Sequence, residues 1–233
     1  QRREGKASEK ATLAAAVDKI SASVELSELS EFCGEADVII DFSHHSLTKE
    51  VIAYAMSRSL PLVMCTTGHT DEEKALISEA AKSIPVFYSA NMSLGVNMLL
   101  KLLQDATKIL APAGFDIEIV EKHHNQKVDA PSGTALALAD AINEELDNRY
   151  EYVYDRSGRR EERSENEIGI SAVRGGTIVG EHDVIFAGED EVITFTHTAY
   201  SKAIFGKGAV EAAKFLKGKG AGLYNMQDVI EAK

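Results

Sequence analysis

The sequence predicts an α/β protein in which an N-terminal doubly wound parallel sheet is followed by a C-terminal α+β domain with a mixed, largely open sheet. Short apolar runs alternate with amphipathic helical patterns over residues 1–92. A long amphipathic segment comes next, and the apolar–polar alternation of strands dominates residues 115–199. A chain of 233 residues is long enough to bury the cores of two such domains.

The N-terminal domain, residues 1–92, is predicted from four short apolar runs that have the character of buried parallel strands. These runs are residues 12–17, 38–42, 61–65 and 85–89. Helical spacing connects them over residues 43–59, with Ser43 as N-cap and Pro61 as the stop, and over residues 71–82, which open with three acidic residues. Because strand and helix alternate, we expect ligands to bind at the carboxyl ends of the strands.

The second domain, residues 93–202, is predicted to begin with a helix at residues 94–111 and to contain another at residues 132–149. Its strands are expected at four alternating segments: residues 115–121, 168–173, 178–186 and 192–199. The charged run at residues 155–167 is interpreted as a solvated or mobile loop without a function. A last helix is expected at residues 205–216, and the segment 203–233, loosened by its glycines, is expected to pack back on the first domain.

Composition excludes several classes of protein. A formal net charge of −12 argues against a nucleic-acid partner, which requires a basic face. No apolar run approaches the roughly 20 residues that span a bilayer, and the first residues do not resemble a signal peptide, so we expect a cytoplasmic protein without a membrane segment. Cys33 and Cys65 lie far apart without close Cys or His neighbours, which predicts neither a disulfide nor a metal site.

The densest group of reactive side chains lies behind the strand predicted at residues 115–121. His123, His124 and Lys127 stand immediately upstream of Ser132-Gly133-Thr134, where a helix is predicted to begin. The free amides of a helix N-terminus attract anions. A surface histidine and a simple serine cap are the ordinary alternatives, but the combination favours a pocket for a carboxylate-bearing molecule that also undergoes proton transfer.

Residues 118–135 read Glu-x-x-Glu-x-His, then Lys, then Asp-x-Pro-Ser-Gly-Thr-Ala, and this pattern resembles the signature of the 4-hydroxy-tetrahydrodipicolinate (dihydrodipicolinate) reductase family. The resemblance covers nearly the whole chain from about residue 12, including residues 40–43, 66–68, 90–97, 174–182 and 222–228. It implies a Rossmann-like first domain and an oxidoreductase of lysine and diaminopimelate biosynthesis. The implied reaction uses NADH, NADPH or both to reduce a cyclic dicarboxylate, 4-hydroxy-tetrahydrodipicolinate, to tetrahydrodipicolinate.

The resemblance also implies a role for each residue of the reactive group. His123 would be the acid/base residue and Lys127 the proton donor, while the substrate carboxylates would be held by His124, Ser132, Gly133 and Thr134. These roles agree with the chemistry, because hydride addition to a carbon–nitrogen double bond builds electron density that a nearby ammonium can neutralise with a proton. Lys202 would add positive charge near the substrate, and a homotetramer would form through the second domain's sheet.

Cofactor-binding residues are implied at three places in the first domain. Asp18 would accept hydrogen bonds from the adenosine ribose, and Lys19 could pair with the 2′-phosphate of NADPH. The nicotinamide half would meet two loops: Cys65, Thr66 and Thr67, and then Ser89, Ala90, Asn91 and Met92. Cys65 replaces the family's usual glycine and is interpreted as a small buried residue, and Met92 stands where an aromatic residue is common. His44 and His45 are interpreted as capping or exposed residues.

The chain departs from the family pattern at its start. Family members open with an apolar strand and a Gly-x-x-Gly-x-x-Gly turn that holds the pyrophosphate, whereas this sequence opens Gln-Arg-Arg-Glu-Gly-Lys, and we expect that these elements precede the given residues. Two alternatives remain open. One is a metal-dependent hydrolase that uses His123, His124 and Asp129. The other is a non-catalytic relative that keeps the fold without the glycine loop.

Overall fold

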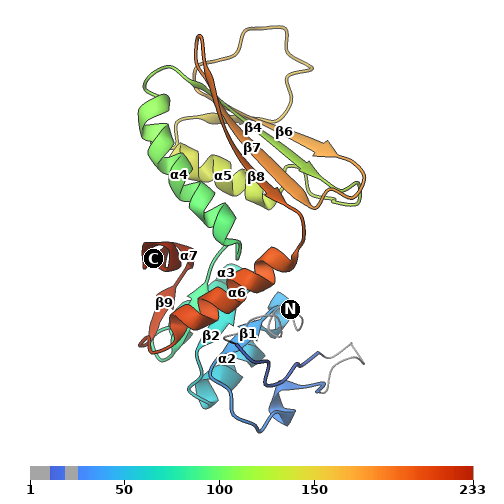
Figure 1. The fold of residues 1–233 in the computed structure, drawn as a ribbon, viewed down its shortest axis with the longest axis vertical. Coiled ribbons are helices and arrows are strands. Elements are labelled where there is room, and N and C mark those ends of the chain that lie inside the picture. Colours follow the sequence, from blue (N-terminus) through green and yellow to red (C-terminus); the bar gives the residue numbers. More distant parts are fainter. Residues whose placement is uncertain (1–10, 19–25, 233) are drawn as a thin grey trace. The chain divides into compact units, whose positions relative to one another are not determined.

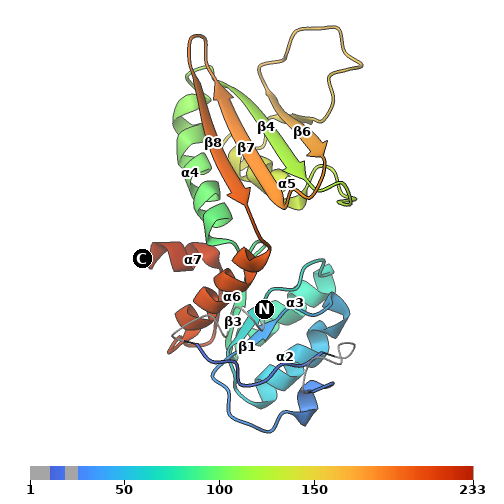
Figure 2. The same cartoon turned by 45° about the vertical axis from the view of Figure 1, so that its right-hand side comes forward.

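The computed structural model describes residues 11–18 and 26–232, and these residues form two compact units (Figures 1 and 2). The first unit comprises Gln1–Leu94 together with Ala203–Lys233, and the second is Gly95–Lys202. The C-terminal segment therefore belongs to the same unit as the N-terminal part of the chain. No helix in the described parts of the chain is long and apolar enough to span a bilayer.

The first unit is built on a parallel sheet with the strand order β1-β2-β3-β9. The strands are β1 (Ile39–Asp41), β2 (Leu62–Met64), β3 (Pro85–Tyr88) and β9 (Gly222–Tyr224). The helices are α2 (Thr48–Ser57), α3 (Asp71–Ala80), α6 (Ala203–Leu216) and α7 (Met226–Glu231), with 3-10 turns η1 (Leu29–Glu31) and η2 (His45–Leu47). Thr70 and Glu73 form a capping box that starts α3, as the acidic start of that segment suggested.

Helices cover both faces of this sheet because successive strand residues point to opposite sides. Leu62 and Met64 pack with α2 and α3, whereas Val63 packs with α6 and α7. All three side chains are fully buried. The predicted doubly wound parallel sheet is therefore confirmed.

The second unit contains a five-stranded mixed sheet with the order β5-β6-β4-β7-β8. Its elements are α4 (Leu94–Leu110), β4 (Asp116–His123), α5 (Gly133–Glu144), β5 (Glu151–Val153), β6 (Glu167–Arg174), β7 (Gly180–Ala187) and β8 (Val192–Ala199). Strands β5, β6 and β4 are mutually parallel, and β7 and β8 continue the sheet antiparallel.

Both helices of the second unit lie on one face of its sheet (Figure 2). Leu103 of α4 and Leu138 of α5 are fully buried against Ile117, Ile119 and Phe186 of the strands. On the opposite face, alternate residues of β8 are exposed, among them Thr194, Thr196 and Thr198. The prediction of an α+β domain with a mixed, largely open sheet is confirmed.

Two predictions near the N-terminus were wrong. Residues 12–17 form no strand, and the only pairing described there is an isolated bridge between Val17 and Leu26. Three consecutive alanines in this segment offer little side-chain area to bury, which makes an apolar run a weak strand former. The helix expected from Ser43 begins at Thr48 instead, because the Asp41 carboxylate accepts the Ser43 N–H at 2.9 Å and holds a turn there.

Two short strands and one short helix were not predicted. The helix expected at residues 132–149 ends at Glu144, since Asp147 and Asn148 adopt positive φ angles of 56° and 55°, and β5 follows. Beyond α6 the chain forms β9, which pairs with β3, and then α7, which Asn225 caps by accepting the Gln227 N–H at 2.7 Å. A three-residue strand such as β9 exists only because its partner is already in place.

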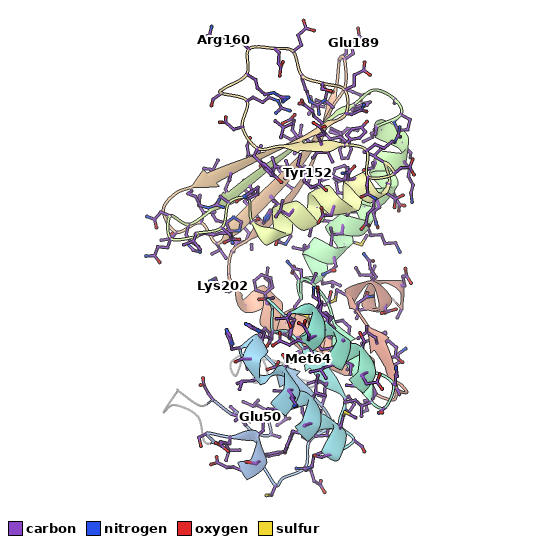
Figure 3. The ribbon with its side chains drawn as sticks, turned by 180° about the vertical axis from the view of Figure 1, so that it is seen from behind. Glu50, Met64, Tyr152, Arg160, Glu189 and Lys202 are labelled. Atoms are coloured by element: carbon purple, nitrogen blue, oxygen red, sulfur yellow. The ribbon has the colours of Figure 1, made fainter. Side chains whose placement is uncertain are left out.

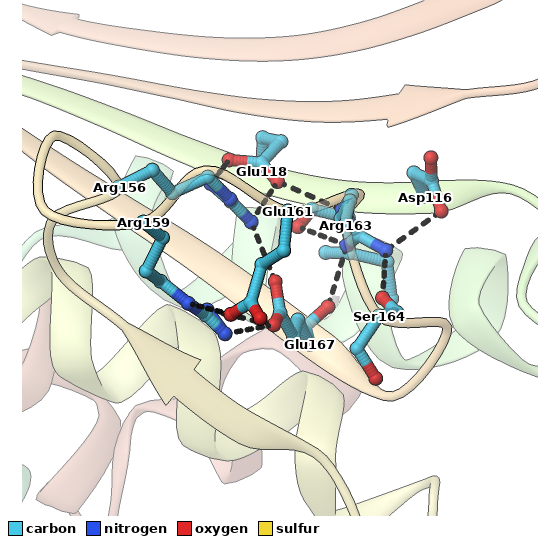
Figure 4. Close-up of polar contacts among 9 residues, drawn as sticks. Asp116, Glu118, Arg156, Arg159, Glu161, Arg163, Ser164 and Glu167 are labelled. Atoms are coloured by element: carbon cyan, nitrogen blue, oxygen red, sulfur yellow. Dashed lines mark hydrogen bonds and ion pairs between the residues drawn. The ribbon is translucent and has the colours of Figure 1, made fainter.

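The charged loop before β6 is mostly exposed, as expected of a solvated segment, but it is also held by ion pairs that were not predicted (Figure 4). Arg156 donates to both carboxylate oxygens of Glu118, at 2.8 and 3.0 Å. Arg159 donates to the buried Glu167 at 2.7 Å, and Arg163 reaches Asp116 at 2.7 Å and Glu118 at 3.1 Å. Arginine forks satisfy several acceptors at once, which lets so polar a segment pack against strands β4 and β6.

We expect Arg163→Ala to lower the free energy of unfolding by about 1–3 kcal/mol, because it removes charged hydrogen bonds that join the loop to β4. Urea denaturation measures this loss. Arg160→Ala is the matched control, since Arg160 lies at the tip of the same loop (Figure 3) and makes no ion pair or hydrogen bond with the described residues. Equal stability of the two variants would contradict a structural role for the network.

Candidate functional site

The carboxyl end of β4 carries the first predicted catalytic residue. His123 is the last residue of this strand and is 8% exposed. Its Nδ1 lies 2.6 Å from Oε2 of Glu121, which is two residues earlier on the same side of the strand and fully buried. Gly180 adjoins the other ring nitrogen, since a Cβ at that position would lie 3.1 Å from Nε2. The histidine is therefore held through one nitrogen while the other faces a position without a side chain.

Lys127 lies in the loop between β4 and α5 and is paired with a carboxylate. Its Nζ donates to both oxygens of Asp129, at 2.7 and 2.8 Å. The hydrogen bond from Lys127 is the main cause that holds the pKa of Asp129 below its ordinary value. The loop is tightly turned at this point, because the Lys127 N–H also donates to the carbonyl of His124 at 3.1 Å. His124 itself is half-buried.

The third part of the site is the start of α5. Ser132 is the N-cap, and its Oγ accepts the Ala135 N–H at 3.1 Å and lies 3.0 Å from Nε2 of His182. The Ser132 N–H donates to Oε1 of Glu121 at 3.0 Å. The polar groups of Ser132 are thus engaged within the protein. Gly133, by contrast, is exposed, and a Cβ there would meet no atom within 4 Å, so the helix start is open beside Gly133.

His182 of β7 contacts Ser132 at this helix start. It is 4% exposed, its ring stands edge-on to His123 with centroids 5.2 Å apart, and its Nδ1 is buried without a hydrogen-bond partner among the described residues. Burial lowers the pKa of His182 from 6.5 to about 4, and the neighbouring His123 adds to this shift. His182 is therefore neutral near pH 7 in the folded protein.

This burial predicts a loss of stability at acid pH. Between pH 6.5 and pH 4 the unfolded state binds a proton at His182 that the folded state does not, so the free energy of unfolding falls as the pH falls. The loss amounts to about 3 kcal/mol at 1.36 kcal/mol per pKa unit. We expect His182→Gln, which can keep a hydrogen bond to Ser132, to show a correspondingly flatter acid limb in urea denaturation. Parallel pH profiles for the two proteins would contradict the assignment.

Glu121, Arg174 and His182 are site residues to which the sequence assigned no role. All three fall inside stretches that resemble the family, but a glutamate on a strand or an arginine at a strand end is ordinarily solvated. Their role is recognised only from the ion pair that the fold creates. Arg174 lies 53 residues from Glu121 in sequence and donates to it at 2.7 and 2.8 Å.

The predicted nicotinamide loops lie together at one edge of the first unit. Cys65, Thr66 and Thr67 follow β2, and the loop of residues 89–92 follows β3, so both loops leave the carboxyl ends of neighbouring parallel strands. Thr66 Oγ1 donates to the buried Asp41 at 2.9 Å, and the Asn91 side chain accepts the Ser93 N–H at 2.8 Å. These side chains hold the loops in shape through hydrogen bonds within the protein.

A buried histidine lies close to the first of these loops. His69, seven per cent exposed, follows directly on the first loop, and its Nε2 is buried without a partner among the described residues. Burial is the main cause that lowers its pKa, so the ring is a neutral group with an unsatisfied nitrogen. Asp18 is exposed, and its N–H donates to the carbonyl of Leu26 at 3.1 Å. Lys19 lies outside the described residues.

Other predicted features are located as follows. Cys65 is buried, and burial raises the pKa of its thiol, which agrees with a small packed residue. His44 accepts the Ser46 N–H and so caps η2, while His45 lies 3.1 Å from Glu73. Lys202 is exposed. Among the described residues, no three His, Cys, Asp or Glu side chains are grouped as metal ligands, and Asp129 is bound to Lys127 rather than to the histidines.

Two family models together match nearly the whole chain. The family described as "Dihydrodipicolinate reductase, N-terminus" matches residues 1–92, and "Dihydrodipicolinate reductase, C-terminus" matches residues 95–230. The 4-hydroxy-tetrahydrodipicolinate reductase of Caldanaerobacter subterraneus subsp. tengcongensis is 58% identical over 205 residues, which cover 88% of this chain and 81% of the relative. The enzyme of the same name from Clostridium tetani is 54% identical, with coverage of 85% and 77%.

A solved structure resembles the chain as a whole. The dipicolinate-bound dihydrodipicolinate reductase from Paenisporosarcina sp. TG-14 superposes with a TM-score of 0.75 over 96% of this chain and 91% of that one. The two sequences are 23% identical, so this likeness shows a common fold.

Proposed function

Because the chain belongs to the dihydrodipicolinate reductase family, a family of oxidoreductases, we propose that it reduces 4-hydroxy-tetrahydrodipicolinate to tetrahydrodipicolinate with NADH or NADPH. The reaction serves lysine and diaminopimelate biosynthesis in the cytoplasm. The observation that carries the proposal is a network of hydrogen bonds that joins His123, the start of α5 and the loop of Lys127. Glu121 binds both His123 and the N-cap of α5, while Arg174 binds both Glu121 and the loop of Lys127.

The loops after β2 and β3 are assigned to the nicotinamide half of the cofactor. Cys65, Thr66 and Thr67 would line one side and Ser89, Ala90, Asn91 and Met92 the other, with Asp18 and Lys19 toward the adenosine. When bound, the nicotinamide supplies the hydride. Backbone groups dominate the binding in this proposal, because Thr66 and Asn91 already use their side chains to shape the loops.

The proton chemistry is assigned to the second unit. In this proposal the 4-hydroxyl group leaves as water, which gives a carbon–carbon double bond conjugated with the ring's carbon–nitrogen double bond, and hydride would then add at carbon 4. Lys127 donates the proton that the resulting conjugated anion takes up, and His123 exchanges protons as the acid/base residue. His124, Gly133 and Thr134 hold the carboxylates, with Ser132 supporting the start of α5. An incoming carboxylate competes with Asp129 for the Lys127 ammonium, which is possible because the Asp129 side chain is 53% exposed.

The experiment is to follow nicotinamide absorbance when the full-length protein, with NADH or with NADPH, meets the fresh condensation product of pyruvate and aspartate semialdehyde. We expect substrate-dependent oxidation with at least one cofactor. A folded full-length sample that oxidises neither would overturn the proposal. Oxidation that disappears on chelation and returns with zinc would show a metal requirement that the proposed mechanism does not contain.

We also propose that the open face of the second unit's sheet forms the interface of a homotetramer. Support comes from the uncovered strands, on which the residues of β8 alternate between exposed and half-buried along all eight positions. Other copies of the chain would supply a covering layer for this face. Sedimentation equilibrium should give about four times the chain mass of 25.2 kDa. A monomeric mass at micromolar concentration would contradict the assembly.

A further inference from the structure

The carboxylate of Glu121 is saturated by four hydrogen bonds although it is fully buried. Oε2 accepts from Nδ1 of His123 at 2.6 Å and from Nη1 of Arg174 at 2.8 Å. Oε1 accepts from the Ser132 N–H at 3.0 Å and from Nη2 of Arg174 at 2.7 Å. Burial opposes ionisation, but the hydrogen bonds from Arg174, His123 and Ser132 outweigh it and hold the pKa of Glu121 below its ordinary value.

An ionised carboxylate can only accept hydrogen bonds, so this contact fixes where His123 carries its proton. A neutral imidazole facing Glu121 through Nδ1 must hold the proton on Nδ1, which leaves Nε2 as the acceptor. Nε2 is the nitrogen that adjoins Gly180, where no side chain blocks it. Glu121, at the Nδ1 side of the ring, therefore selects the tautomer in which Nε2 can accept a proton.

Arg174 extends the same arrangement to the loop that carries Lys127. Its Nη2 donates to the main-chain carbonyl of Asp129 at 2.6 Å, two residues beyond Lys127. Strand pairing places Arg174 directly opposite His123, and the Gly175 N–H donates to the His123 carbonyl at 2.9 Å. One guanidinium thus fixes the carboxylate behind His123 and the backbone beside Lys127.

We propose that Glu121 and Arg174 are positioning residues of the reductase, with Glu121 selecting the Nδ1-protonated tautomer of His123 and Arg174 joining Glu121 to the Lys127 loop. The expected effect of these two residues on catalysis rests on the proposed function, whereas the assignment of the His123 tautomer does not. Neither residue needs to touch the substrate to act in this way.

Glu121→Gln tests the proposal because a glutamine cannot satisfy all four donors. The amide NH₂ of the glutamine can take the place of either carboxylate oxygen. In one orientation it faces the Ser132 N–H and Arg174, which are both donors and cannot accept its hydrogens. In the other orientation it faces His123 and Arg174. Only His123 can adapt, by moving its proton to Nε2 and accepting through Nδ1. We therefore expect the ¹⁵N spectrum of histidine-labelled protein to show a protonated Nδ1 in the wild type and a protonated Nε2 in the variant, with the His123 signals assigned by His123→Gln.

In the reductase assay we expect kcat to fall about 10²-fold in Glu121→Gln, within the range of general acid–base catalysis, with KM changed only a few-fold. Glu167→Gln is the matched control, since Glu167 is also a buried, arginine-paired carboxylate but has no contact with His123, and both readouts should stay at wild-type values. Arg174→Lys should weaken catalysis less, because one charged bond to Glu121 can remain.

The outcomes separate the two proposals. A wild-type His123 protonated on Nε2, or a folded Glu121→Gln protein with unchanged tautomer and kcat, would overturn the positioning role. If Glu121→Gln does not fold, the wild-type spectrum still decides the tautomer and Arg174→Lys still tests the kinetics. An inactive wild type with the expected Nδ1 signal would overturn the proposed function and leave the tautomer assignment standing.

Discussion

Replacing His123 or Lys127 by alanine is expected to lower kcat by about 10²–10⁴-fold, because each variant removes a proton-handling group from the site. The fold should survive both changes. Without the His123 ring, Glu121 is still bound by Arg174 and by the Ser132 N–H, and without the Lys127 side chain, Asp129 is left largely exposed to water. Steady-state kinetics with the preferred nicotinamide cofactor measures the effect.

Two further variants refine this prediction. Lys127→Arg keeps a positive charge beside Asp129 but holds its proton too firmly to donate it, so it should be nearly as inactive as the alanine variant. Lys108→Ala is the control, since Lys108 is likewise an ion-paired lysine of the second unit, with its Nζ 3.3 Å from Glu145, the C-cap of α5, and its loss should leave kcat unchanged. Wild-type turnover by Lys127→Arg would mean that Lys127 supplies charge and not a proton.

Gly208→Ala is expected to produce the largest loss of stability in the first unit. In α6 this glycine is buried against the loop after β3, and a Cβ at position 208 would lie 1.6 Å from the main-chain oxygen of Met92. A backbone oxygen cannot move aside as a flexible side chain can, so the helix or the loop must shift, at a cost of about 1–3 kcal/mol or more. This cost reverses the stabilisation of about 1 kcal/mol that alanine ordinarily gives a helix over glycine.

Urea denaturation should show the loss, and cofactor affinity should fall with it, because Met92 belongs to a proposed nicotinamide loop. Gly220→Ala provides the control in the same unit. Position 220 has no atom within 4 Å of a built Cβ and no positive φ, so stability should be retained or slightly increased. A Gly208→Ala protein as stable as the wild type would show that α6 can move away from the loop without penalty.

Much of the fold could be predicted because its signals are local. A helix does not continue through Pro61, and α2 ends shortly before it at Ser57. The Thr70–Glu73 capping box starts a helix, and the apolar run at residues 85–89 is typical of a buried strand. For the site, the adjacency of His123, Lys127 and Ser132 in sequence places them on one strand end, one loop and one helix start. Such short connections leave few arrangements open.

What the sequence by itself determined is therefore the alternation of elements, the family and the group of residues around His123. Tertiary structure decided the rest, because it depended on partners distant in sequence. The alanine-rich segment at residues 12–17 does not pair with any strand of the sheet, whereas β9 pairs with β3. The charged loop before β6 forms ion pairs with Glu118 and Glu167. A charged side chain is ordinarily solvated, and only burial beside an opposite charge, as for Glu121 and Arg174, makes it structural.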